Sequence, residues 1–366
     1  MREEIIGIVG DVPYTSEIIL AARQYGYIVY HYHTAVNKYS VAHKEITGSY
    51  CDRASLIQFA KEIDRLLIIT DKLDIDIIYA MSSYTLLLQS FELFEVCQNR
   101  FVEKLFLEEK RINVTPYTLI TSVGELPEML SSIGFPALLE TNQVAKNPYE
   151  KIMILDHDMD ESVFDMLQHS PAVLSAWVAS QRQFEISVGR DVDGTIFLLP
   201  ITENVYVNGR LKYATASLRL NPEWARELKR IATTVVEQVS GTCLLSVKVV
   251  LSDKGIFYVD KVSLTPSTAQ LFSQKQVSYS TAQLFVRIAV GLPVLLEHVQ
   301  QEVVLIPVYD SMVDKFELVS KVKPTWEHAY LTGDEMIRGI LRLTGKNSME
   351  LLEEVNRNEL FYTERT

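Results

Sequence analysis

The chain has 366 residues, of which 48% are hydrophobic and only 15 are Gly and 12 are Pro, a composition that excludes a disordered protein. The net charge of -12 and the pI near 5.2 argue against a wide nucleic-acid-binding surface. No apolar run approaches the length of a bilayer span, and Met1 to Glu4 do not resemble a signal peptide. We therefore expect a cytoplasmic protein with no nucleic-acid and no membrane partner.

Residues 1–95 predict a small doubly wound α/β domain. Apolar runs at Ile5 to Val9 and Tyr27 to Tyr32 flank a helical pattern from about Thr15 to Tyr25, which is typical of a strand-helix-strand unit in a parallel sheet. The next cycle is predicted as a helix at Asp52 to Ile63, a strand at Leu66 to Thr70 and another strand at Asp76 to Ala80.

Residues 96–170 predict a second α/β unit. The expected elements are a helix over 96–110, a strand over 114–119, a helix over 123–133 and a strand over 135–140.

Residues 171–300 have a different sequence pattern, in which long stretches of alternating apolar and polar residues predict an antiparallel sheet. We expect strands over 175–190, 195–201 and 204–208, a helix over 222–240, and a hairpin at the Asp253-Lys254-Gly255 turn. The tail, 301–366, predicts a small C-terminal extension that includes a helix over 348–358. The three cysteines, Cys51, Cys97 and Cys243, form no CxxC motif and are expected to be reduced thiols.

Several stretches match, in order, the motifs of one enzyme family. Gln98 to Lys104 resembles a QDRxxEK helix start, and Ile133 to Leu139 resembles the family's Gly-x-Pro turn and strand. The family's RDxDGxxxxxPxxEN strand pair is matched by Asp191 to Gly194, Pro200, Glu203-Asn204 and Gly209. Its NEIAPRP motif is matched by the segment Asp260 to Pro266, and its closing helix by Arg287 with Gly291 to Pro293. Across about two-thirds of the chain the order and spacing are kept. On these residues the chain resembles the N5-carboxyaminoimidazole ribonucleotide synthetases of purine biosynthesis, in the ATP-grasp superfamily, as a divergent member.

The resemblance implies an α/β protein of the ATP-grasp fold, with an N-terminal doubly wound parallel-sheet domain, a central α+β domain and a C-terminal α+β domain. Residues 96–170 and 171–300 then form the central and the C-terminal ATP-grasp subdomains. It also implies a cytosolic homodimer, ATP and Mg²⁺ as cofactors, and a ligase that joins bicarbonate to aminoimidazole ribonucleotide. ATP in such a fold requires cations on its phosphates, a glycine-rich loop and carboxylates that hold Mg²⁺.

The resemblance places four residues at nucleotide-binding positions of the family. Lys104 corresponds to the first phosphate-binding lysine, but Glu140 stands where the family has the second, and a carboxylate there repels phosphate. The loop that follows, Gln143 to Glu150, has no glycine where the family has GYDGKGQ. In the next strand an ungapped match places Gln183 at the family's glutamate, whereas a gapped match uses Glu185. We prefer the ungapped match because it keeps Phe184, Ile186 and Val188 on one buried face.

At the family's metal-ligand positions the chain has lysines, Lys248 and Lys261. An ammonium group cannot coordinate Mg²⁺, so the residues predict no metal at this place. The substrate positions of the family correspond to Arg190, Lys72 and Asp74, and the family's N-terminal GGGQLGRM loop corresponds to Gly10 to Glu17.

Three interpretations of these charge reversals stay open. Glu140 pairs with Lys248 or Lys261 in place of the nucleotide, the charges are unrelated and solvated, or the two lysines hold a phosphate-bearing ligand without a metal. His31 and His33 point the same way from a strand end, which is more often structural than metal-binding without further ligands. We expect an acidic turn around His157, formed with Asp156, Asp158 and Asp160, and no hydrolase chemistry at Ser246, Ser263 or Ser267.

Three functions from different classes follow. The first is a homologue with little or no ligase activity that binds a small anionic metabolite or a partner protein in purine metabolism. The second is an active ATP-dependent carboxylate-amine ligase. The third is a structural, dimer-forming protein.

Overall fold

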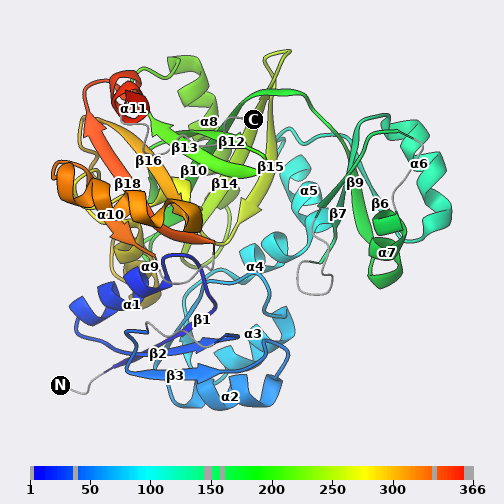
Figure 1. The fold of residues 1–366 in the computed structure, drawn as a ribbon. Coiled ribbons are helices and arrows are strands. Elements are labelled where there is room, and N and C mark those ends of the chain that lie inside the picture. The colour runs from blue at the N-terminus through cyan, green and yellow to red at the C-terminus, as the bar shows by residue number, and fades with distance from the viewer. Residues whose placement is uncertain (1–3, 36–39, 144–150, 157–160, 332–335, 358–366) are drawn as a thin grey trace.

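The computed structural model describes residues 4–35, 40–143, 151–156, 161–331 and 336–357, and its three sheets form three lobes (Figure 1). The N-terminal lobe is a five-stranded parallel sheet in the order β3-β2-β1-β4-β5, which confirms the doubly wound α/β prediction. Its strands are β1 (Ile5–Val9), β2 (Ile28–His33), β3 (Lys44–Thr47), β4 (Arg65–Ile68) and β5 (Leu86–Leu87), and its helices are α1 (Thr15–Gln24), α2 (Arg53–Lys61) and α3 (Ile75–Ser82).

The strand predicted at Asp76 to Ala80 is wrong, because this segment is helix α3. The Asp74 side chain accepts a hydrogen bond from the backbone N–H of Asp76 at 2.9 Å and so caps the helix. Ile77, Ile78 and Met81 are buried at helical spacing, which gives the segment one apolar face. A short apolar run fits either structure, and the cap decides between them.

The second lobe is a four-stranded antiparallel sheet in the order β6-β9-β7-β8 with its own apolar core. Two helices, α4 and α5, lead into it from the N-terminal lobe (Figure 1). The elements are α4 (Phe91–Gln98), α5 (Arg100–Glu109), β6 (Tyr117–Ile120), the 3-10 turn η1 (Val123–Glu125), α6 (Leu126–Ile133), β7 (Ala137–Thr141), β8 (Lys151–Ile154), α7 (Glu161–His169) and β9 (Ala172–Ala176).

The largest sheet has nine strands, eight of them in the order β15-β14-β10-β12-β13-β16-β18-β17, with β11 paired to β10. The predicted strand over 175–190 is two strands in two different sheets, β9 and β10, joined by residues 177–179. The predicted C-terminal segment adds three strands to this sheet. The strands are β10 (Ser180–Arg190), β11 (Ile196–Leu198), β12 (Thr202–Val207), β13 (Arg210–Ala216), β14 (Cys243–Ser252), β15 (Phe257–Ser263), β16 (Glu302–Tyr309), β17 (Glu327–Tyr330) and β18 (Ile337–Gly345).

Helices cover both faces of the large sheet. The long α8 packs its buried Leu228, Ile231 and Val235 against a core shared with the N-terminal lobe, whereas α9 packs against α1 in a second core. Shared cores fix the large sheet and the N-terminal lobe to one another and position the loop after β15 at the N-terminal sheet. The helices and turns are α8 (Pro222–Val236), η2 (Thr268–Gln270), α9 (Thr281–Val290), η3 (Asp310–Met312), α10 (Val313–Val322) and α11 (Ser348–Arg357).

In the described parts of the chain no helix is long and apolar enough to cross a membrane. The three cysteines are free thiols; Cys51 is exposed, and Cys97 and Cys243 are buried.

Candidate functional site

A cavity of about 140 Å³ separates the four-stranded sheet from the β14-β15 edge of the large sheet. Charged side chains enter it from α5, β7, β8 and β15, and the segment 175–178 forms one wall. Both Lys104 and Glu140, which the resemblance assigns to the nucleotide, line it together with Gln183. The structure therefore brings three of the predicted cofactor-binding residues to one place, which we call the interlobe cleft.

Arg100 is the centre of the charge network in the interlobe cleft. Its Nε and Nη2 atoms donate to the Glu140 carboxylate at 3.1 and 3.0 Å, and its Nη1 atom donates to Glu103. Nη2 also donates to the backbone carbonyl of Asp260 on β15. The Lys151 ammonium group lies 3.7 Å from the other Glu140 oxygen. These contacts tie α5 to both sheets, so the cations and carboxylates of the cleft neutralise one another.

The hypothesis that Glu140 pairs with Lys248 or Lys261 is wrong. Its partners are Arg100 and Lys151, and neither predicted lysine forms an ion pair with it among the described residues. The Glu140 side chain lies within reach of Arg100 because the start of α5 lies beside the end of β7, where the Arg100 backbone N–H donates to the Asn142 carbonyl at 2.9 Å. The sequence does not indicate this contact.

Lys104 is a buried cation in an unfavourable environment. Its side chain is 2% exposed, and its ammonium group donates to the Thr115 hydroxyl at 3.3 Å and lies 5.3 Å from the centre of the Tyr117 ring. Burial, and then repulsion by Arg100, lower the pKa of Lys104 to about 8.

The two lysines at the family's metal positions lie directly opposite each other on β14 and β15. The register changes between this pair and Val249↔Val259, which leaves Asp260 as the extra residue of a β-bulge. Asp260 lines the cleft, where Lys151, Arg100 and Lys248 outweigh the effect of burial and lower the pKa of its carboxyl group. The carboxylates of the cleft are thus surrounded by cations rather than gathered around an empty metal position.

Gln183 and Glu185 have different environments although they lie on the same face of β10. Gln183 lines the cleft, whereas Glu185 is fully buried in the sheet. The Glu185 carboxylate accepts hydrogen bonds from Asn204 at 3.0 Å, from the Ser246 hydroxyl at 2.5 Å, and from the Ser267 backbone and hydroxyl at 3.1 and 2.6 Å. Four donors satisfy this carboxylate, and they join β10, β12 and β14 to the loop after β15.

The opposite face of β10 confirms the strand prediction, because Phe184, Ile186 and Val188 are all in the core.

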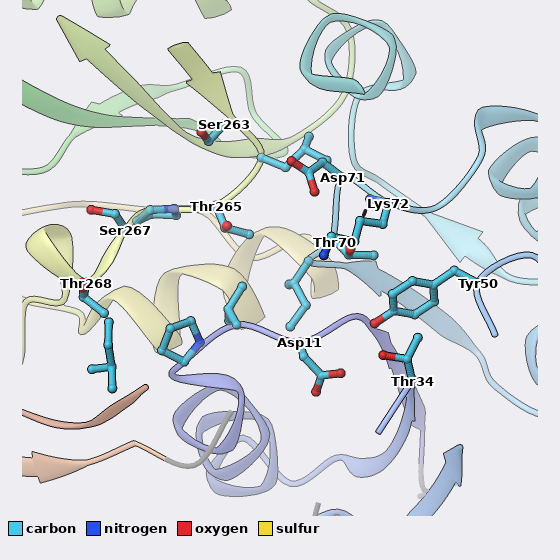
Figure 2. A pocket seen from close by; sticks show the side chains of 16 residues that line it. Asp11, Thr34, Tyr50, Thr70, Asp71, Lys72, Ser263, Thr265, Ser267 and Thr268 are labelled. Atoms are coloured by element: carbon cyan, nitrogen blue, oxygen red, sulfur yellow. Dashed lines mark hydrogen bonds between the residues drawn. The ribbon is translucent and has the colours of Figure 1, made fainter. Parts of the chain in front are cut away.

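A second and larger cavity, of about 420 Å³, lies at the carboxyl ends of the N-terminal strands. Ligands of open α/β sheets bind at this edge. Figure 2 shows Asp11, Thr34 and Tyr50 at one end of it and Ser263, Thr265 and Ser267 on the side of the loop after β15. The Tyr14 hydroxyl donates to the Pro266 carbonyl at 2.7 Å and holds that loop against α1. We call this cavity the sheet-edge pocket; its lining is rich in hydroxyl groups.

The three predicted substrate residues do not come together. Lys72 lines the sheet-edge pocket, but Asp74 caps α3 and is absent from the lining. Arg190 lies at the end of β10, where its guanidinium group donates to the carbonyl of Val239. The loop segment 144–150, the acidic segment 157–160 and the tail segment 332–335 lie outside the described residues.

The sequence did not single out Arg100, Asp260 or Tyr50 as site residues. Arg100 was visible only as one letter of the QDRxxEK match, and its role depends on contacts with residues 40 and 160 positions away. Tyr50 follows β3 (Lys44–Thr47), a strand that the sequence analysis did not predict.

The comparisons with known proteins agree with one another. The ATP-grasp domain model matches residues 105–280. The N5-carboxyaminoimidazole ribonucleotide synthase of Bacillus subtilis is 24% identical over 295 residues, which cover 79% of this chain and 77% of the relative. A crystal structure of the ADP complex of an N5-carboxyaminoimidazole ribonucleotide synthetase superposes with a TM-score of 0.87 at 21% identity, covering 98% of this chain and 96% of that one. The Staphylococcus aureus synthetase complexed with ADP also has a TM-score of 0.87, at 16% identity, covering 98% and 97%.

Proposed function

Because this chain has the ATP-grasp fold and belongs with the N5-carboxyaminoimidazole ribonucleotide synthetases as a distant relative, we propose that it binds a small ribosyl phosphate in the sheet-edge pocket and does not use Mg-ATP as those enzymes do. The observation that carries this proposal is the pair of lysines, Lys248 and Lys261, which face each other where the family resemblance requires metal-binding carboxylates.

The residues present do not fit Mg²⁺ in the interlobe cleft. Magnesium ions in proteins are held by carboxylate oxygens and phosphates, and an ammonium group has no lone pair to offer. Within the residues that the structure describes, three His, Cys, Asp or Glu side chains converge at metal-binding distance only at Asp11, His31 and His33, which lie in the N-terminal lobe. We therefore derive no reaction step through Mg²⁺.

The size and charge of the cleft support the same proposal. Small-molecule sites usually have about 300 to 1,000 Å³, whereas the cleft has about 140 Å³. Arg100, a buried cation of the cleft, is bonded to Glu103 and Glu140, so a phosphate group has to displace a carboxylate to reach it.

The sheet-edge pocket suits a ribosyl phosphate better. Its volume falls within the usual range, and its hydroxyl groups can bond to a ribose. Lys72 supplies a cation for a phosphate group. One related synthase structure holds ADP together with 5-aminoimidazole ribonucleotide, which makes that nucleotide the first ligand to test.

A second candidate is an active ATP-dependent ligase that joins bicarbonate to aminoimidazole ribonucleotide. The comparisons favour it over loss of activity, since the relatives that match over most of this chain are named as N5-carboxyaminoimidazole ribonucleotide synthases. Lys104, retained in the cleft, is compatible with it.

One pair of experiments separates the two candidates. Purified protein is incubated with aminoimidazole ribonucleotide, bicarbonate, ATP and Mg²⁺, and ADP release is followed beside the Bacillus subtilis enzyme as a positive control. Our proposal predicts no ADP release above the background, whereas release that depends on the ribonucleotide establishes the ligase.

Thermal unfolding then measures binding of the ribonucleotide alone, because a ligand of the native state raises its stability. We expect a rise in Tm with the unmodified chain that is reduced in Lys72→Ala and kept in Lys275→Ala, a change at an exposed lysine outside the pocket. No rise in the unmodified chain contradicts the ligand assignment.

A further inference from the structure

Two histidines are completely buried at the carboxyl end of β2. His31 and His33 are two residues apart on the strand, so their side chains project to the same face. Their rings are stacked, with centres 4.6 Å apart and an angle of 8° between the planes. Neither belongs to the lining of the interlobe cleft or of the sheet-edge pocket.

Two carboxylates from the neighbouring strands face these rings. Glu45 on β3 places one oxygen 3.7 Å from His31 Nδ1 and the other 3.6 Å from His33 Nε2. Asp11, which follows β1, places an oxygen 3.5 Å from His31 Nε2. All three separations exceed the usual hydrogen-bond distance, and together the two carboxylates surround the imidazoles with negative charge.

Most of the imidazole nitrogens of His31 and His33 lack a hydrogen-bond partner among the described residues. His31 Nε2 lies 2.9 Å from the Gly10 carbonyl and so carries a proton that it donates there. Over the described residues, His31 Nδ1, both nitrogens of His33 and one oxygen of Glu45 are buried without a hydrogen-bond partner. Buried polar atoms without partners are uncommon and destabilising, and a bound ion is one of the recognised explanations for them.

We propose that His31, His33, Glu45 and Asp11 form a binding site for one divalent transition metal ion of the Zn²⁺ class. Two imidazoles and carboxylate oxygens are ligands that Zn²⁺ and its neighbours accept, unlike the all-oxygen shell that Mg²⁺ prefers. From the sequence alone this histidine pair is interpreted as structural, because no further ligands are evident. The parallel strand order β3-β2-β1 brings Glu45 and Asp11 to the pair as further ligands.

The geometry requires only side-chain movement. Zinc bonds to nitrogen and carboxylate oxygen measure about 2.0 to 2.2 Å, and one ligand atom from each of Asp11, His31 and His33 already lies within 4.8 Å of the others. His31 Nδ1 and both nitrogens of His33 have no hydrogen-bond partner among the described residues and can therefore supply ligand atoms to a common ion. The Gly10 carbonyl then remains the acceptor for the opposite nitrogen of His31, an arrangement typical of metal-bound histidine.

Asp11 also lines the sheet-edge pocket, where Figure 2 shows it beside Thr34 and Tyr50. An ion held here therefore lies at the wall of the pocket.

The test is metal binding by the full-length protein, in a Cys51→Ser background that removes the one exposed thiol. The protein is stripped with a chelator, dialysed against Zn²⁺ and titrated with Co²⁺, whose visible absorption reports the nature of its ligands. We expect one equivalent of Zn²⁺, a Co²⁺ spectrum with nitrogen ligands, and a rise in Tm on metal addition. Absence of stoichiometric binding overturns the proposal.

Variants identify the ligands. His33→Ala is expected to weaken Zn²⁺ binding by at least about 100-fold and Glu45→Gln by about 10-fold to 100-fold, whereas the control His328→Ala, at an exposed histidine, leaves it unchanged. Circular dichroism confirms folding, and Glu45→Gln serves if His33→Ala fails to fold. Unchanged affinity in folded His33→Ala or in Glu45→Gln overturns the assignment. These readouts do not depend on ribonucleotide binding or ADP release, so this inference and the proposed function fail separately.

Discussion

Replacement of Arg100 by methionine tests the charge network of the interlobe cleft. The side chain of Arg100 is 9% exposed, and those of Glu103 and Glu140 are 3% and 13% exposed. Removal of one partner from a buried ion pair usually costs about 3 to 5 kcal/mol, since the remaining charge stays buried without compensation. Glu140 keeps Lys151, and Glu103 keeps the backbone N–H of Val262, so we expect the lower end, about 3 kcal/mol.

The assay is urea unfolding at pH 7, with Arg230→Met as the matched control. Arg230 pairs with Glu227 at 2.7 Å, but the two side chains are 49% and 39% exposed. An exposed pair of this kind contributes less than about 1 kcal/mol. In the double variant Arg100→Met with Glu140→Gln, the carboxylate that loses Arg100 is also removed, so part of the lost stability returns. If Arg100→Met is no more destabilising than the control, the network does not hold the cleft together.

Two further predictions concern buried ionisable groups. The pKa of Lys104 is about 8 in the folded protein and near 10.4 when unfolded, so the folded state binds fewer protons between these values and its stability rises with pH there. Lys104→Met removes this pH dependence of the stability. We expect the variant to be more stable than the parent by roughly 3 kcal/mol at pH 7, and we expect urea unfolding to show this difference shrinking from pH 8 to 10.5. A constant difference contradicts the buried-cation assignment. Glu185→Ala leaves the donors of Asn204, Ser246 and Ser267 unpaired, so we expect the free energy of unfolding to fall by about 3 kcal/mol. The fall is expected to be smaller in Glu185→Gln. Equal losses of stability in the two variants refute the importance of these hydrogen bonds.

The sequence predicts the N-terminal lobe well because hydrophobic patterning and strand order coincide there. Ile5–Val9 is apolar throughout, as expected of a central parallel strand buried on both faces. The same criterion fails at Asp76 to Ala80, where a run of five residues is too short to distinguish strand from helix. The hydrogen bond from the Asp76 backbone to Asp74 is the local signal that separates them.

The candidate site is predictable only in part. The position-by-position resemblance assigns Lys104, Glu140 and Gln183 to one site. In the structure these residues line one cleft, because homologous folds preserve the placement of strand ends. It gives no information on the partners of Glu140, since these depend on where the start of α5 lies beside the end of β7. The histidine site was missed for the same reason. His31 and His33 are neighbours on one strand, whereas Asp11 and Glu45 reach them from two other strands whose order the sequence does not state.

The most direct test of the account is calorimetric titration of the purified protein with ADP, first without Mg²⁺ and then with saturating Mg²⁺, beside the Bacillus subtilis synthase. The lysine pair at 248 and 261 and the internally paired carboxylates of the cleft predict that Mg²⁺ does not strengthen ADP binding to this chain, whereas it does for the synthase. Tight ADP binding that requires Mg²⁺ contradicts the account and establishes that the cleft works as in the ligases that it resembles.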